Sequence, residues 1–221
     1  MTPLKSNAQR AKTALAFIWL VLALEIVSLV SDYFQFVLLQ NAAEGKHVSL
    51  DMANANDSRQ QVIAILYLIV YIISGITFIL WFRRAYFNLQ AKKSGLSFTD
   101  GWAAGCWFVP VVKLYRPYQI MKEMFQKTDE LLAKKYINDA EHLNTSTLGW
   151  WWALFLISGF IGRIVFRFSL NANTIDQLIE STLASMISSI VSIPLALITI
   201  KIIKDYSNIE PLMFEITDEI V

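Results

Sequence analysis

The sequence contains little of what metal and disulfide chemistry require. Cys106 is the only cysteine among 221 residues, so no disulfide forms within the chain and no cysteine cluster holds a metal ion. His47 and His142 are the only histidines, and nothing in the sequence brings them together. We therefore expect neither a metal site nor a cofactor.

The sequence is also poor in charge and in catalytic motifs. Charged residues make up 17% of the chain against 55% hydrophobic residues, and the 19 basic and 18 acidic residues nearly cancel, which argues against a nucleic-acid partner. There is no phosphate-binding glycine loop, no dinucleotide-binding glycine motif, no His-Glu-x-x-His and no nucleophile elbow. These absences favour a non-enzymatic protein, and we assign no catalytic residue.

Four long apolar runs dominate the chain. They cover residues 14–39, 62–82, 148–168 and 181–203. A helix needs about 20 apolar residues to cross the hydrocarbon core of a bilayer, so each run is long enough to span it. We expect an all-α, polytopic integral membrane protein with four transmembrane helices, forming a single domain over residues 1–221.

The basic residues between the runs predict the orientation. Ten lysines and arginines lie between the second and third runs, three precede the first run, and none lies between the third and fourth. Cytoplasmic loops carry an excess of lysine and arginine, so both termini and the central segment are predicted to be cytoplasmic.

The central segment, residues 83–140, is expected to be ordered. Its apolar stretch 101–112 is too short to span a bilayer, which predicts a re-entrant or surface-lying half helix with Asp100 as its cap. After Pro117, apolar residues recur at helical spacing and predict an amphipathic helix against the membrane face or the helix bundle. The acidic tail, residues 205–221, either docks on this basic segment or stays solvated.

Three motifs around the central segment resemble a known family. They are Trp-x-x-Arg-Ala-Tyr-x-Asn-Leu at residues 81–89, Gly-Trp-Ala-x-Gly-x-Trp-Phe-Val-Pro at 101–110, and Leu-Tyr-Arg-Pro-Tyr-Gln-x-Met at 114–121. This pattern resembles the bacterial membrane family named domain of unknown function 4328, with Lys113 as a departure from its usual small or amide residue. The resemblance implies a multi-pass protein of the bacterial inner membrane and supplies no reaction.

The central segment is the first candidate for a binding site. Basic side chains attract anionic headgroups, each contributing about 1 kcal/mol near the surface, and aromatic rings occupy the membrane interface. We expect the segment to bind anionic lipid, a small anionic ligand or a partner protein; the alternative is that its residues only stabilise a re-entrant fold. The candidate residues are Arg83, Arg84, Trp102, Trp107, Lys113, Arg116 and Tyr118.

Polar residues inside the predicted spans form a second candidate. Glu25 and Asp32 share one face of the first predicted helix. The helical rise puts Glu25 near the depth of Arg163, and it likewise puts Asp32 near Arg167, which predicts two cross-helix ion pairs. The fourth run carries a face of serines at positions 181, 185, 188, 189 and 192. These groups either pack the helices or line the pathway of an oligomeric transporter or channel subunit, so the expected partners are membrane lipids and a second copy or another membrane protein.

Overall fold

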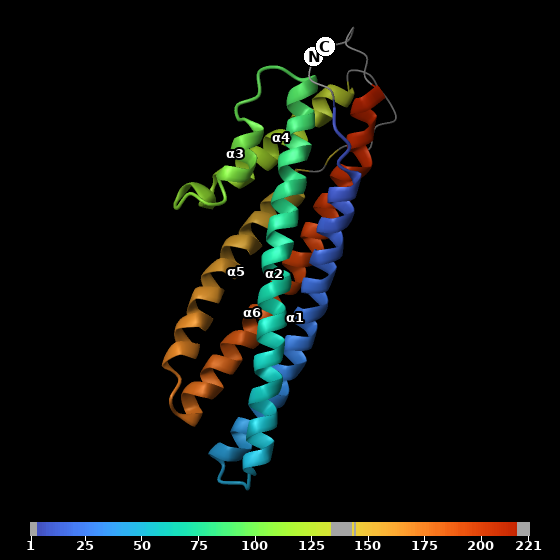
Figure 1. Cartoon of the computed structure of the whole chain (residues 1–221). Helices are drawn as coiled ribbons and strands as arrows, with labels where there is room; N and C mark the ends of the chain where they lie inside the picture. Colours follow the sequence, from blue (N-terminus) through green and yellow to red (C-terminus); the bar gives the residue numbers. More distant parts are fainter. Residues whose placement is uncertain (1–3, 134–142, 144, 216–221) are drawn as a thin grey trace. The chain divides into compact units, whose positions relative to one another are not determined.

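The computed structural model describes residues 4–133, 143 and 145–215, so parts of the predicted central segment and of the acidic tail, with His142, lie outside the described residues. The described residues form helices connected by loops, without a strand (Figure 1). Four helices are long and apolar enough to cross a membrane, which confirms the predicted all-α, polytopic class. The helices are α1 (Ala8–Ala43), α2 (Leu50–Lys92), α3 (Asp100–Gly105), η1 (Val112–Leu114), α4 (Arg116–Ala133), α5 (Ser146–Asn171), α6 (Ile175–Ile209) and η2 (Glu210–Glu215).

The long helices extend past the apolar runs that predicted them. The helix α2 has 43 residues, or about 65 Å at the α-helical rise, while a hydrocarbon core is about 30 Å thick. It begins after Ser49, whose Oγ accepts a hydrogen bond from Met52 N (3.2 Å), and the loop beyond it contains Gly95 at φ +76°. The first motif, residues 81–89, is therefore the last part of this helix.

The chain divides into two compact units. The motif unit comprises Met1–Phe17, Ile73–Trp152 and Ile198–Val221, and the four-helix unit comprises Ile18–Ile72 and Ala153–Leu197. All three family-like motifs fall in the motif unit. The serine face of α6 and the four charges predicted inside the spans fall in the four-helix unit.

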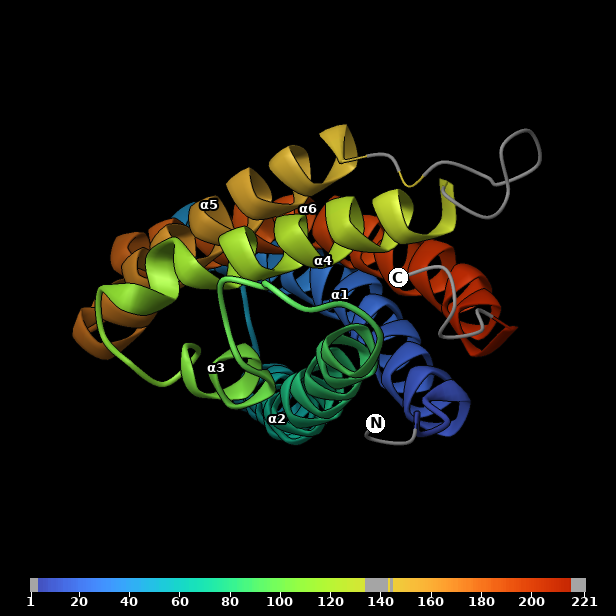
Figure 2. The ribbon, with the colours of Figure 1, turned by 90° about the horizontal axis from the view of Figure 1, so that it is seen from above.

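The amphipathic helix α4 packs against helices of the motif unit. Its apolar positions, spaced as a helix requires, are all buried, and they include Phe125 at 1% exposure. The ring of Phe125 lies 5.5 Å from that of Tyr206 on α6, and Thr128 Oγ1 hydrogen-bonds Tyr206 Oη at 3.1 Å. In Figure 2, α2 is seen nearly end-on while α4 runs across the view. Of the two predicted positions for this helix, packing against the protein is the one observed.

The predicted half helix is shorter than expected. Thr99, not Asp100, is the cap: its Oγ1 accepts a hydrogen bond from Trp102 N at 3.3 Å. The helix α3 then ends at Gly105, well before Pro110. The chain continues as an irregular loop in which Val111 has φ +67°, an uncommon conformation for a β-branched residue.

Replacing Phe125 by alanine is expected to destabilise the motif unit. Removing a fully buried ring leaves a cavity between α4 and α6, which typically lowers the free energy of unfolding by about 3 kcal/mol or more. Thermal unfolding in a mild detergent measures the change. Phe108→Ala is the matched control, because that ring is 76% exposed and its loss leaves no cavity. Equal melting temperatures for the two variants would contradict the assigned packing.

Candidate functional site

A buried carboxylate joins three segments of the motif unit. Glu210, 4% exposed, lies at the start of η2. Its Oε1 accepts a hydrogen bond from Asn88 Nδ2 (2.7 Å), and its Oε2 accepts one from Asn7 Nδ2 (3.0 Å). Asn88 lies in the first motif on α2, and Asn7 directly precedes α1. The C-terminal end of α6 is thereby tied to the N-terminal segment through α2.

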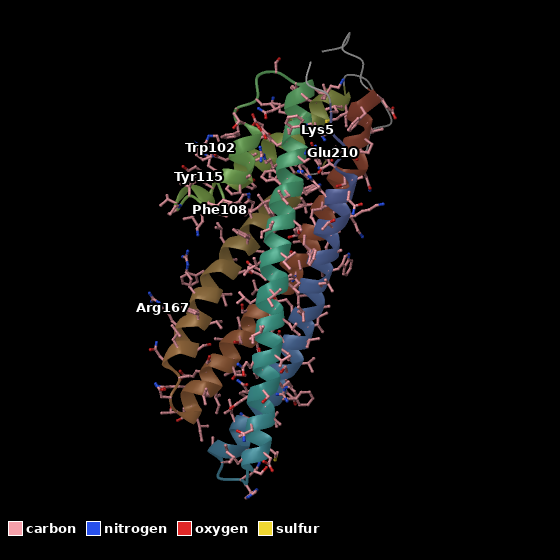
Figure 3. The ribbon with its side chains drawn as sticks, viewed as in Figure 1. Lys5, Trp102, Phe108, Tyr115, Arg167 and Glu210 are labelled. Atoms are coloured by element: carbon pink, nitrogen blue, oxygen red, sulfur yellow. The ribbon has the colours of Figure 1, made fainter. Side chains whose placement is uncertain are left out.

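Asn88 makes full use of its amide. Besides donating to Glu210, its Nδ2 donates to Lys5 O (2.8 Å), and its Oδ1 accepts from Lys5 N (3.0 Å). Figure 3 shows Lys5 and Glu210 close together. An asparagine side chain offers two donors and an acceptor, whereas an aspartate carboxylate has no donor and leucine has neither, so the network requires an amide at this position. We name Asn7, Asn88 and Glu210 the carboxylate clamp.

The carboxylate clamp is not among the sites predicted from the sequence. The first motif nevertheless contains a usable signal, because its polar residue Asn88 lies next to the apolar residues Ala85 and Leu89 on one helix. Both apolar residues are fully buried. Glu210 was counted only as part of an acidic tail. In the described part of that tail, Glu210 accepts hydrogen bonds from the amides of Asn7 and Asn88, which are not the basic side chains that the predicted docking invoked.

The predicted basic residues have different environments. Arg83 pairs with Asp100 at the start of α3 (3.0 Å), and the Arg84 guanidinium lies 5.8 Å from the ring of Phe87. Lys113 is exposed and forms no ion pair among the described residues. Arg83 and Arg84 therefore make contacts within the protein, whereas Lys113 is exposed.

Arg116 lies among aromatic rings beside Lys113. Its guanidinium is 5.2 Å from the ring of Phe98 and 5.4 Å from that of Tyr115, and its Nη1 donates to Gln119 Oε1 at 3.2 Å. Such cation–π contacts hold the group in place while leaving its charge unneutralised.

Two of the predicted aromatic site residues pack inside the motif unit. The ring of Trp107 lies 5.7 Å from Phe78 on α2 and 6.3 Å from Trp152 on α5. Tyr118 stacks on Trp152 at 6.2 Å, and Trp152 Nε1 donates to Leu114 O at 3.1 Å. These contacts fasten the loop after α3 to the apolar parts of α2 and α5.

The same loop presents an apolar patch. Phe108 is 76% exposed and Val111 is 69% exposed. Neither side chain therefore gains the stabilisation that burial of an apolar side chain normally provides. Figure 3 shows the side chains of Trp102, Phe108 and Tyr115 on α3 and the following loop, on the side away from α2. The apolar patch consists of Trp102, Phe108, Val109, Val111, Leu114 and Tyr115.

Cys106 directly follows α3 in the chain and is fully buried. Burial raises the pKa of its thiol to about 11, so it stays protonated at neutral pH and is a poor nucleophile. No group of three or more metal-ligating side chains is found in the described ranges.

In the four-helix unit, Glu25 and Asp32 have partners other than those predicted. Glu25 Oε1 accepts a hydrogen bond from Tyr67 Oη at 2.6 Å, and Asp32 Oδ1 accepts one from Gln60 Nε2 at 3.1 Å. Arg163 and Arg167 are exposed on α5, and no ion pair joins either to Glu25 or Asp32 among the described contacts. The predicted link between α1 and α5 is replaced by hydrogen bonds between α1 and α2.

A polar cavity of about 300 Å³, widely open to the surface, lies near the end of the four-helix unit where α1 is followed by α2 and α5 by α6. Asp32 lines it together with the amides of Gln35 and Gln60, neither of which is a predicted site residue. The Gln35 amide donates to Thr182 Oγ1 at 2.8 Å. The predicted serine face contributes Ser181 and Ser185.

A family model described as "Domain of unknown function (DUF4328)" matches residues 44–208. No curated protein and no solved structure matches the chain.

Replacing Asn88 by leucine is expected to lower the free energy of unfolding by about 1–3 kcal/mol, because one oxygen of the buried Glu210 loses its donor. Titration with sodium dodecyl sulfate in mixed micelles, followed by tryptophan fluorescence, measures the change. Asn208→Leu serves as control, since that asparagine is exposed on α6. A clamp that contributes nothing would make the two variants equally stable.

Proposed function

Because the chain belongs to the family described as domain of unknown function 4328, to which that description assigns no activity, we propose a function from the geometry of the motif unit. The protein is a non-enzymatic, multi-pass membrane module whose central segment binds anionic lipid. The basic residues of this segment predict that it lies on the cytoplasmic side. The observation that carries the proposal is the apolar patch with Lys113 and Arg116 beside it.

The depth of the apolar patch supports lipid as the ligand. Its loop contacts Phe78 and Trp152 through Trp107. Phe78 lies one helical turn before the end of the second apolar run, and Trp152 one turn after the start of the third, so both are about 6 Å inside their runs. Side chains held at that level meet the boundary between acyl chains and headgroups, where tryptophan and tyrosine are favoured.

The charges beside the patch support an anionic headgroup. Lys113 lies within the loop and Arg116 at the start of α4, and each cation near an anionic surface contributes about 1 kcal/mol to binding. A small soluble anion would gain nothing from the neighbouring apolar side chains, which makes it a less favoured ligand than lipid. Arg83 and Arg84 contribute less in this proposal, because Arg83 is paired with Asp100 and Arg84 lies over Phe87.

The proposal predicts loss of anionic lipid when Lys113 and Arg116 are neutralised. Two cations at about 1 kcal/mol each correspond to a roughly 30-fold weaker affinity for phosphatidylglycerol in the K113Q/R116Q variant. Native mass spectrometry of protein extracted in mild detergent, with identification of the retained molecule, measures this. Arg116→Lys should keep most of the binding because it keeps the charge.

The control is K12Q/K201Q, which removes two other exposed cations, of which Lys201 is paired with Asp205 at 2.9 Å. Equal lipid loss in control and variant would show a nonspecific charge effect and contradict the site. Retention of a soluble anion or of a protein subunit in place of lipid would assign the segment to one of the other two predicted ligand classes.

A transporter or channel subunit is the second candidate function, and the polar cavity favours it. The cavity brings Asp32 together with the serine face of α6, as a polar pathway would. Four spanning helices are few for a monomeric transporter, so this function needs an oligomer. It predicts that Glu25→Gln abolishes a proton- or ion-coupled flux into vesicles, since that carboxylate is buried in the same unit. Unaltered flux would reject this candidate.

A further inference from the structure

The helix α5 carries two arginines on an uncovered apolar surface. Arg163 and Arg167 are both exposed, and no residue is buried in the most apolar stretch of the helix. Three exposed apolar residues continue the same line at spacings of four and three, as one face of an α-helix requires. We name this face the α5 stripe; it consists of Leu156, Phe160, Arg163, Arg167 and Leu170.

Lipid alone is a poor environment for this stripe. Charged side chains on membrane helices face a protein interior or a water-filled cavity and pair with one another. Neither arginine forms an ion pair within the part of the chain that the structure describes. We therefore expect an acidic side chain from outside this copy of the chain to pair with the stripe at the depth of its arginines.

The chain itself carries such an acid. Glu180 on α6 is exposed and forms no ion pair among the described residues. Arg167 lies four residues before the end of α5 at Asn171, and Glu180 lies five residues after the start of α6 at Ile175. These positions are about 6 Å and about 7.5 Å from the same end of the helix hairpin.

We propose that the α5 stripe is the interface with a second copy of this chain, in which Arg167 pairs with Glu180 of the second copy. Two copies inserted in the same direction are related by a two-fold axis along the membrane normal, so each residue keeps its depth and the pair forms twice. Arg163, one turn deeper, reaches toward the same carboxylate with its long side chain. This interface lies in the four-helix unit and does not rest on the lipid-binding proposal.

The backbone of α5 permits close approach beside the stripe. Gly159 flanks it, and nothing lies within 4 Å of the position that a Cβ atom would occupy there. Small residues at such positions let membrane helices approach closely, which strengthens packing between them.

Charge reversal tests the pairing in the full-length protein. Energy transfer between labelled copies in phosphatidylcholine vesicles gives the dissociation constant of the dimer. We expect R167E and E180R each to raise it at least about tenfold, and R167E/E180R to restore it to within about threefold, because the pair is re-formed with its charges exchanged. Asp51→Arg, at another exposed acid of the four-helix unit, should leave it unchanged.

Crosslinking gives an independent readout. In a Cys106→Ser background, differently tagged R167C and E180C chains expressed together should be joined by a short bismaleimide crosslinker, because two side chains as long as arginine and glutamate hold their backbones too far apart for a direct disulfide; D51C paired with R167C should not be joined. A monomeric wild-type protein would overturn the proposal. So would single variants that dissociate without recovery in the double variant, since that result assigns Arg167 to an acid other than Glu180.

Discussion

A hydrocarbon core offers no hydrogen-bond partner, so every polar group placed in it must be satisfied by the protein itself. This constraint makes the four long segments helical, because an α-helix pairs its own backbone groups. It also governs the side chains. Glu25 accepts from Tyr67, and Asp32 accepts from Gln60, so each buried carboxylate has a donor on the neighbouring helix.

A packed protein interior likewise excludes water, so the buried polar groups of the first motif also need partners from the protein. Three of the motif's side chains donate hydrogen bonds within the motif unit: Trp81 Nε1 donates to Ser207 Oγ, Tyr86 Oη donates to Glu123 Oε2, and Asn88 Nδ2 donates to Glu210. These bonds run from α2 to α6, α4 and η2. The first motif therefore holds α2 to α4, α6 and η2, and the loop of the second motif is attached to these helices.

The second motif has the opposite character. Trp107 and Cys106 are turned inward and hold the loop, whereas Phe108 and Val111 are exposed. Folding such a loop leaves apolar area uncovered, and the lipid-binding proposal assigns the missing cover to the bilayer. The exposed arginines of α5 pose the inverse problem, since a charged group there gains from a protein neighbour. Lipid binding is proposed for the exposed apolar loop, and dimer formation is proposed separately for the exposed arginines.

The sequence by itself determined the class of the protein, its four spanning helices and the buried face of α4, because length and periodicity depend only on local order along the chain. Its motifs also identified the family. Tertiary structure alone decided the partners of the polar groups. Helical rise assigns Glu25 a depth, but the rotation of each helix and the choice of neighbour decide that it meets Tyr67 and not Arg163. Asn88 and Glu210 are 122 residues apart, and only packing brings them together.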